Sequence, residues 1–333
     1  MPLISVIIPV HNGELTIFNT IESVLSQTLP DFELIVINAD SCDLTLDIVS
    51  SIKDQRLKVF TYPKANVAVN RNRGVTHACS EFVTFLDADD LWTPDKLSCQ
   101  YKALEENPEA ALAYSFTNAI DEKGKFLRGC STIAVTGDVY PHLLLEDFIG
   151  NGSNVMIRKQ AFIAVGGFDE SLTNAQDSDL WLRLAARYHF VAVPKAQVLY
   201  RVSANSMSSD VLKLENACLQ VLERAFNQAP ESLQYLKPYC LANLYKYLLY
   251  RVLEGQPESK KTRMAVIFLA KAIATDPSLL FKGAIFKALL KLTAIAFLPS
   301  RQAYALFNKI PRISNTSTLL GYIKLDPFSL KNN

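Results

Sequence analysis

Apolar and polar residues follow an alternating strand and helix pattern over the first 118 residues of the chain. Short runs rich in apolar and β-branched residues predict buried strands, at residues 3–9, 32–37, 57–62, 83–86 and 111–115. Between these runs, apolar residues recur at helical spacing and predict helices, at residues 14–27, 44–52, 67–78 and 94–106. Strands that alternate with helices are typical of an α/β protein whose mostly parallel sheet is covered by helices on both faces.

The pattern changes in two later parts of the chain. Residues 119–203 predict short, mixed elements, namely a hairpin-type turn at 121–124, strands at 155–158 and 198–202, a tight turn at 166–169 and a helix at 178–187. Beyond the Ser- and Asn-rich segment, only helical spacing follows, at residues 211–229, 241–253, 261–274 and 279–297. We therefore expect an α/β domain at 1–208 and an all-helical domain at 209–333 that associates with a membrane or binds a partner.

Composition and charge narrow the classes of partner and compartment. The 333 residues include 34 lysines and arginines and 33 acidic residues, a net charge of +1, so the surface as a whole gives no indication of a nucleic acid partner. The six cysteines are scattered without a C-x-x-C pair, as expected of free thiols in a reducing compartment. The first apolar run lacks a preceding basic region and is too short for a signal peptide, which predicts a cytoplasmic protein.

Three carboxylates, Asp87, Asp89 and Asp90, directly follow the predicted strand at 83–86. In open α/β sheets, ligands bind at the carboxyl ends of the strands. Adjacent negative charges repel one another unless a cation neutralises them, and carboxylates spaced D-x-D suit a hard divalent ion such as Mg²⁺ or Mn²⁺. Residues 93–94, Thr-Pro, have the types of an N-cap and a first helical position. A solvated acidic turn in front of a helix is therefore the alternative interpretation.

Six short motifs occur in an order and at spacings that together indicate a family. They are SVIIPVHN (5–12), QTLPDFELIV (27–36), RNRG (71–74), FLDADDLWTPDKL (85–97), VGGFDESL (165–172) and QDSDLWLRL (176–184). Over residues 3–203 the chain resembles the family 2 glycosyltransferases, which have the GT-A fold. The resemblance implies transfer of a sugar from a nucleotide diphosphate donor to an acceptor hydroxyl of a polysaccharide, lipid-linked or protein glycan. In this family the transfer usually proceeds with inversion and with a bound divalent metal.

The resemblance assigns the acidic cluster to the metal and the donor. Mn²⁺ or Mg²⁺ would bridge the diphosphate oxygens and stabilise the negative charge that grows on the departing nucleoside diphosphate. We expect Asp89 to be the principal metal ligand and Asp87 to contact both the metal and the ribose. Asp90 is expected either to bind the metal or to lie behind its ligands.

The resemblance places the nucleotide beside the ends of the first three strands, at Pro9, His11, Asn12, Asn38, Asp40 and Arg71. His11 stands where the family usually has a tyrosine that stacks on the base, and an imidazole stacks over less area. Ala39 stands where the family has an acid that accepts a hydrogen bond from the base. Asp40 is the alternative acceptor, one residue further along and differently directed. The identity of the nucleotide base is therefore left open.

The resemblance also indicates a general base, which inversion requires to remove the proton of the attacking hydroxyl. The family has an acid pair at the start of a late helix. Asp177 matches the second member of this pair, whereas Gln176 replaces the first. Asp179 is two residues away, on a different side of the helix, and is the second candidate. The alternative for Asp177 is an ordinary acid in a first helical turn, where the helix dipole favours it.

Two further segments carry hypotheses with open alternatives. The turn at 151–154 precedes a strand that, by the resemblance, lines the acceptor side. In residues 279–298, Lys282, Lys287 and Lys291 fall within one half of a helical wheel and leave the other half apolar. This helix is predicted either to lie in a membrane interface at the inner face of the membrane or to pack on its neighbours with a lysine-bearing edge.

Three classes of function are therefore weighed. An inverting glycosyltransferase is the leading hypothesis. A catalytically weak nucleotide-sugar-binding or scaffold protein of the same fold is the second, because Ala39 and Gln176 depart from the family pattern. A sugar nucleotidyltransferase is the third, and it lacks support because His-Asn-Gly at 11–13, rather than a Gly-rich phosphate loop with a lysine, follows the first strand.

Overall fold

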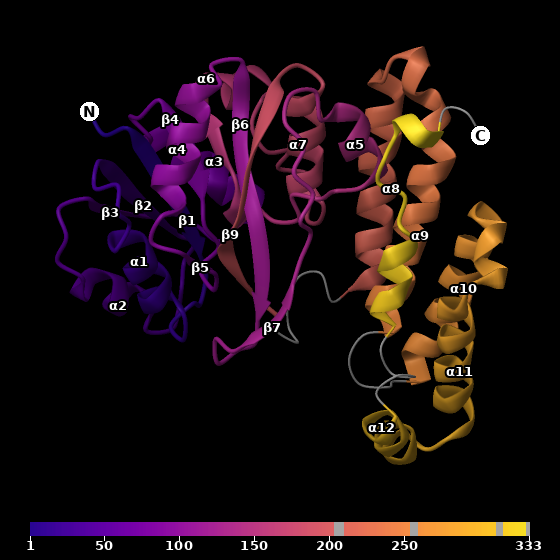
Figure 1. Ribbon diagram of the computed structural model, residues 1–333. Helices are drawn as coiled ribbons and strands as arrows, with labels where there is room; N and C mark the ends of the chain where they lie inside the picture. Colours follow the sequence, from indigo (N-terminus) through magenta and orange to yellow (C-terminus); the bar gives the residue numbers. More distant parts are fainter. Residues whose placement is uncertain (203–209, 254–258, 311–315, 331–333) are drawn as a thin grey trace. The chain divides into compact units, whose positions relative to one another are not determined.

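The computed structural model describes residues 1–202, 210–253, 259–310 and 316–330. The chain divides into two compact units, Met1–Leu143 with Asp147–Ser209 and Leu144–Glu146 with Asp210–Asn333. The first unit carries the sheet and the second consists of helices (Figure 1). The predicted α/β class with a helical C-terminal extension is thus confirmed.

Four parallel strands form one half of the sheet, in the order β3-β2-β1-β4. They are β1 (Ile4–Val10), β2 (Phe32–Asn38), β3 (Leu57–Thr61) and β4 (Phe82–Phe85). Val6 and Ile8 belong to a core cluster with residues of helix α1 (Ile17–Leu25), whereas Ile7 lies against Gly74 of helix α3 (Val67–His77). Helices therefore cover both faces, which explains why the sequence shows continuous apolar runs here rather than alternation. The connecting helices are α1 (Ile17–Leu25), α2 (Thr45–Ser51), α3 (Val67–His77) and α4 (Lys96–Glu106).

The other half of the sheet is mixed. Beyond β4 it continues through β8 (Met156–Arg158), β6 (Ala110–Ile120), β9 (His189–Arg201) and β5 (Leu91–Trp92), and β7 (Phe126–Gly129) pairs with β6. The predicted turn at 121–124 is confirmed in the β6–β7 hairpin, where Gly124 N donates to Asp121 O at 2.9 Å. β6 and β9 are longer than predicted, because they pair in parallel along their length through irregular steps in register. These steps break the simple periodicity on which the prediction rested.

The strand order places a switch point between β1 and β4. The chain proceeds from β1 to β2 on one side, and β4 lies on the other side of β1. Loops that leave two such strands diverge, and the crevice between them is where open α/β sheets bind ligands. The loop from His11 follows β1, and the acidic turn at 86–90 follows β4. The candidate residues therefore lie where the topology favours a site.

Several helix boundaries differ from the prediction. α4 begins at Lys96 rather than at Pro94, because Leu91–Trp92 pairs with β9 and a turn follows before the helix. The helix predicted at 279–297 is divided, with the short 3₁₀ helix η4 (Pro277–Phe281) and α11 (Gly283–Phe297) separated by an extended residue, Lys282. The remaining helices of the first two hundred residues are α5 (Tyr140–Leu145), η1 (Gly152–Asn154), α6 (Lys159–Ala164) and α7 (Gln176–Ala185).

The second unit is built from α8 (Val211–Gln228), η3 (Glu231–Leu236), α9 (Lys237–Leu253), α10 (Ser259–Thr275), η4, α11, α12 (Ser300–Lys309), η5 (Ser317–Tyr322) and η6 (Phe328–Leu330). Its core contains fully buried Leu248, Ala272 and Ala288 from three of these helices. A buried ion pair joins Lys246 Nζ to Asp276 Oδ2 at 2.8 Å. Within the described parts of the chain, none of the helices has the length and apolar character needed to cross a membrane.

The close packing of α3 on β1 can be tested at Gly74. A Cβ at this position would overlap Cγ2 of the buried, β-branched Ile7. Gly74→Ala should therefore lower the free energy of unfolding by about 1–3 kcal/mol, despite the gain of about 1 kcal/mol in helix propensity. Urea denaturation measures the change. Gly129→Ala is the matched control, because its nearest neighbour would be Asn118 Oδ1 at 3.8 Å; equal stability of the two variants would contradict the packing argument.

Candidate active site

A single buried arginine joins two of the predicted site carboxylates. Arg71 extends from α3 and its side chain is 1% exposed. Its Nη2 donates to Asp87 Oδ1 at 2.6 Å, and its Nη1 donates to Asp177 Oδ1. Burial disfavours the charged guanidinium, but Asp177 and Asp87 more than offset this and raise the pKa of Arg71. The structure thus brings together three predicted residues, of which Arg71 and Asp177 are 106 positions apart in the sequence.

The guanidinium of Arg71 has room at this position because Gly152, which it contacts, has no side chain. A Cβ at Gly152, the first residue of η1, would overlap the guanidinium of Arg71. Nε of Arg71 is buried and has no hydrogen-bond partner among the described residues. The Nε–H is therefore an unused donor, whereas Nη1 and Nη2 each donate to a carboxylate.

Asp177 lies in the first turn of α7, two residues after a strained backbone position. Ala175 has a φ of 56°, in the left-handed region that non-glycine residues rarely adopt, and such strain often occurs at functional sites. The Asp177 side chain is 21% exposed. Burial raises the pKa of its carboxyl; Arg71 opposes this rise, and the charges of Asp87 and Asp147 add to it.

Asp179, the second candidate base, is engaged elsewhere. Its Oδ2 accepts from Arg183 Nε at 2.8 Å and from Arg183 Nη2 at 2.6 Å, and its side chain is 6% exposed. A carboxylate held in this way is a support for Arg183 rather than an accessible proton acceptor. The geometry therefore favours Asp177 of the two.

Asp90 points into the protein. It is fully buried, with Oδ2 accepting from Ser153 Oγ at 2.6 Å and Oδ1 accepting from the backbone N of Arg201 at 2.9 Å. Burial, with the charges of Asp89 and Asp87, raises the pKa of Asp90 well above its usual range. Of the two roles expected for Asp90, the geometry favours the one behind the metal ligands.

Ser153 makes three hydrogen bonds, two to the acidic turn and one to Trp92 just after it. Besides donating to Asp90, its Oγ accepts from the backbone N of Asp87 at 3.0 Å. Its carbonyl accepts from Trp92 Nε1 at 2.8 Å. Because Gly152 beside it leaves room for Arg71, the turn at 151–154 supports both sides of the site. The sequence suggested an acceptor-side role for this turn, and its supporting role was missed.

Asp89 is the carboxylate that remains accessible for a metal. No side chain of the described residues donates a hydrogen bond to its carboxylate, whereas Arg201 Nε donates to its backbone carbonyl oxygen at 2.8 Å. Burial together with the charge of Asp87 raises the pKa of Asp89 to about 6. Asp87 keeps one oxygen that Arg71 does not engage. Across the described residues no group of three metal-ligating side chains is assembled. A Mg²⁺ or Mn²⁺ ion held by one or two carboxylates and completed by substrate phosphates and water fits this arrangement.

The loops after β1 and β2 are tied to each other. His11 Nδ1 lies 2.8 Å from the Ala39 carbonyl oxygen. The side chain of Asn12, which has a φ of 54°, accepts from Cys42 N at 2.9 Å. Asn38 is buried, and its Oδ1 accepts from Ser41 N at 3.3 Å. The predicted nucleotide residues of these loops therefore form one connected ledge at the carboxyl ends of the strands.

The remaining predicted nucleotide residues differ in access. Pro9 is buried within β1 and pairs with Ile37, so only the loop beyond it can meet a ligand directly. Asp40 is exposed and has a φ of 57°, again in the left-handed region. Ala39 is fully buried. At this position the chain therefore presents an accessible carboxylate one residue later than the family pattern.

Comparison with known proteins identifies the family. The sequence model described as "Glycosyltransferase like family 2" matches residues 5–252. The chain belongs to glycosyltransferase family 2.

Curated relatives carry glycosyltransferase names. An uncharacterized glycosyltransferase of Rickettsia felis is 29% identical over 204 residues, which cover 61% of this chain and 33% of that protein. A UDP-Glc:alpha-D-GlcNAc-diphosphoundecaprenol beta-1,3-glucosyltransferase, WfgD of Escherichia coli, is 30% identical over 74% of this chain and 95% of its own length. The putative teichuronic acid biosynthesis glycosyltransferase TuaG of Bacillus subtilis is 32% identical over 64% of this chain and 84% of its own. The chain thus spans only about a third of the Rickettsia relative.

Solved structures share the fold of this glycosyltransferase. Staphylococcus aureus TarS 1–349 in complex with UDP matches with a TM-score of 0.53 and 20% identity, over 82% of this chain and 88% of that one. The mannosyltransferase PcManGT from Pyrobaculum calidifontis, in complex with GDP-Man and Mn²⁺, matches with a TM-score of 0.58 and 19% identity, over 93% and 88%. At this identity the likeness supports the fold.

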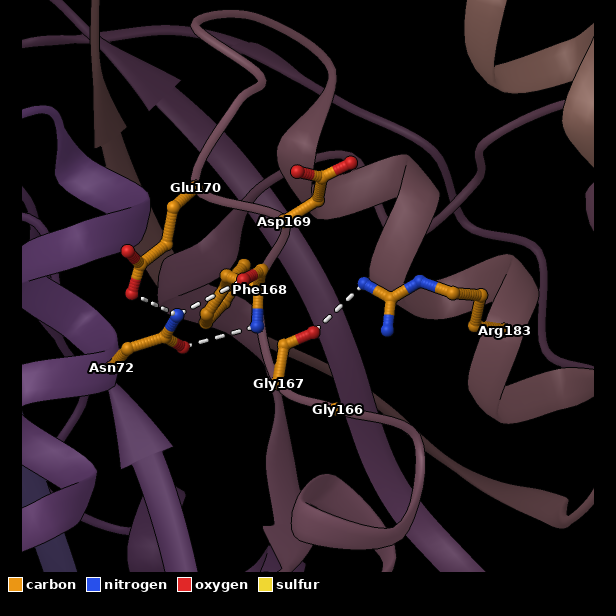
Figure 2. Close-up of a pocket in the computed structure, with 7 residues that line it drawn as sticks. All are labelled: Asn72, Gly166, Gly167, Phe168, Asp169, Glu170 and Arg183. Carbon is orange, nitrogen blue, oxygen red and sulfur yellow. Dashed lines mark hydrogen bonds between the residues drawn. The ribbon is translucent and has the colours of Figure 1, made fainter.

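A hollow of about 390 Å³ in this glycosyltransferase is lined by Asn72, Arg183 and the loop at 166–170 (Figure 2). Asn72, next to Arg71 in α3, donates to Phe168 O at 2.9 Å and accepts from Phe168 N at 3.0 Å. From the other side, Arg183 Nη2 donates to Gly167 O at 2.8 Å. Neighbouring residues of the RNRG motif thus hold α7 and this loop, and the sequence analysis did not assign Asn72 this role.

The supporting role of Ser153 predicts a loss of metal affinity. Ser153→Ala removes one of two donors to buried Asp90 and leaves Asp87 N without its acceptor, a cost of about 1–3 kcal/mol. We expect Mn²⁺ in the presence of a nucleoside diphosphate to bind about five- to hundredfold more weakly, as measured by isothermal titration calorimetry. Ser50→Ala, on an exposed position of α2, is the control. Parental affinity in Ser153→Ala would show that the turn does not depend on this serine.

Proposed function

We propose that this glycosyltransferase moves a sugar from a nucleoside diphosphate donor to an acceptor hydroxyl with inversion. The observation that carries the proposal is the Arg71 bridge, which sets the candidate base Asp177 and the donor-side carboxylate Asp87 on one buried cation. An inverting transfer needs a proton acceptor and a leaving-group site on opposite faces of one bound sugar. The Arg71 side chain contacts Asp177 and Asp87 at the same time and so holds the two carboxylates close together.

Asp89 and Asp87 are proposed to hold Mn²⁺ or Mg²⁺. The metal, when bound, neutralises the charge that develops on the departing diphosphate. Asp90 and Ser153 keep the acidic turn in shape from behind. The archaeal mannosyltransferase of the same fold was solved with Mn²⁺ and GDP-Man, which is in keeping with this proposal.

The ledge formed by His11, Asn12, Asn38 and Asp40, with Pro9 at its base, is proposed to receive the nucleotide. Asp40 is proposed to accept a hydrogen bond from the nucleotide base, because Ala39 is buried and has no polar side chain. The Nε of Arg71 is buried and has no partner among the described residues, so Arg71 is proposed to act on the donor through Asp87 rather than by direct contact.

The acceptor is proposed to be a lipid-linked glycan of cell-envelope assembly. Two relatives carry names of this kind, the Escherichia coli enzyme with a diphosphoundecaprenol-linked acceptor and the Bacillus subtilis protein of teichuronic acid biosynthesis. Such an acceptor places the reaction on the cytoplasmic side, at the inner face of the membrane. Residues 279–298 are proposed to provide a peripheral membrane contact.

A catalytically weak nucleotide-sugar-binding protein is the second candidate, and Ala39 is the observation that favours it. The acid that this chain lacks at position 39 would accept a hydrogen bond from the nucleotide base. Its loss weakens selection of the nucleotide but leaves the candidate metal ligands and Asp177 in place. Binding of a nucleoside diphosphate without turnover of any sugar donor would support this candidate over the enzyme.

Donor binding should require a divalent metal. The carboxylates of Asp87 and Asp89 repel a diphosphate unless a cation lies between them. Calorimetry with UDP or GDP should show binding with Mn²⁺ and at least tenfold weaker binding in excess chelator. Asp89→Asn should reproduce the effect of the chelator, whereas exposed Asp47→Asn should not. Equal affinity with and without chelator would rule out the metal assignment.

Removal of the base should slow transfer and leave donor binding intact. Asp177→Asn keeps the shape of the side chain and the oxygen that faces Arg71, and a lost general base costs on the order of 10²–10⁴-fold in rate. Parent activity should fall with acidification around a midpoint above the usual aspartate range, because the pKa of Asp177 is raised and the base acts only when ionised.

Asp179→Asn is the matched control on the same helix. It should lower the melting temperature through loss of the Arg183 ion pair, with a smaller effect on turnover of the folded enzyme. Full turnover by a folded Asp177→Asn variant would exclude Asp177 as the base.

A further inference from the structure

The C-terminal part of the chain contains a long stretch of one charge sign. Between Asp276 and Asp326 the sequence has no acidic residue, and it has seven cations, Lys282, Lys287, Lys291, Arg301, Lys309, Arg312 and Lys324. The chain as a whole is nearly neutral, with a net charge of +1. A segregated cationic segment of this kind indicates an anionic partner.

α11 exposes an apolar face within this segment. One side of the helix, with Ile285, Ala288 and Leu292, packs into the core of the second unit. The opposite side exposes Phe286 (65%), Leu289 (47%), Leu290 (38%) and Phe297 (82%), and the preceding η4 exposes Leu280 (58%) and Phe281 (90%). A helix on the surface of a globular protein normally presents polar residues outward. We call these six residues the α11 face.

The lysines do not lie as the helical wheel predicted. Lys291 is buried, and its Nζ donates to the carbonyl oxygen of Leu253 at 2.6 Å. Lys282 is exposed at the start of α11, and Lys287 is half-buried beside the α11 face. The apolar side chains are therefore outermost, with Lys282 and Lys287 beside them. This is the arrangement of an interfacial helix rather than of a solvated lysine-bearing edge.

We propose that the α11 face docks on an anionic lipid surface. Its phenylalanines and leucines enter the boundary between headgroups and acyl chains, and Lys282 and Lys287 meet the lipid phosphates. The 15-residue α11 is about 22 Å long, shorter than the ~30 Å hydrocarbon core, so it lies on the bilayer and does not span it. A second copy of the chain is disfavoured as the occupant, because it would bring two acid-free cationic segments together.

The proposal deepens the peripheral membrane contact proposed above for residues 279–298. These residues take no part in the proposed sugar transfer, so failure to bind vesicles and failure to transfer sugar are separate results. The full chain should sediment with vesicles that contain phosphatidylglycerol at low salt, and it should not sediment with phosphatidylcholine alone. Binding should weaken steeply as the ionic strength rises. Failure of the full chain to bind anionic vesicles at low salt would overturn the proposal.

Two sets of variants separate the apolar and the charged contributions. Phe281→Ser with Phe286→Ser and Phe297→Ser should reduce vesicle partitioning at least tenfold at an unchanged melting temperature, because all three side chains are exposed. Lys282→Gln and Lys287→Gln should each reduce it about fivefold. Phe126→Ser with Leu127→Ser is the control, because these two residues are also exposed apolar side chains but belong to the first unit.

The variants also test the other occupants. A parent that is dimeric by light scattering, and that the triple phenylalanine variant converts to a monomer, would assign the face to a second copy and overturn the lipid proposal. Parental partitioning of the triple variant would overturn it as well.

Discussion

The site depends on one buried cation. Arg71 is withdrawn from solvent, and its charge is stable there because two carboxylates from different segments face it. Leaving a buried charge without its partner typically costs 3–5 kcal/mol, on the order of a third of a domain's stability. The fold must therefore bring α3, the turn after β4 and the start of α7 together. The glycines at 74 and 152 serve this arrangement, one by letting α3 approach β1 and the other by leaving room for the guanidinium.

The local pattern of the sequence was sufficient for the parallel half of the fold. β1, β2 and β4 are buried on both faces, so their apolar runs were continuous and unambiguous. β5 and β7 could not be predicted in this way, because β5 has only two residues and β7 is mostly exposed. Both exist through pairing with strands distant in sequence or across a hairpin, which a local pattern does not encode.

Residue types indicated which groups do chemistry, but not which way they face. The D-A-D-D cluster reads as three equivalent carboxylates, yet Asp90 is turned inward by Ser153 and Arg201, which lie 63 and 111 positions further along the chain. The same holds for Lys291, because a helical wheel shows that two sides differ and does not show which side packs. Such directions are set by contacts between distant segments, so the structure is needed to divide the cluster into a ligand and a support.

An arginine beside a candidate base raises a question of strength, because a cation stabilises the ionised carboxylate and makes it a weaker base. Here burial works in the opposite direction and prevails, so that the pKa of Asp177 stays above its usual value despite Arg71. The positive charge of Arg71 interacts with both Asp177 and Asp87, so it is shared between the two carboxylates. A metal or diphosphate that changes the charge near Asp87 therefore also changes how strongly Arg71 stabilises the ionised Asp177. The bridge therefore couples Asp87 to the candidate base Asp177 through a single guanidinium.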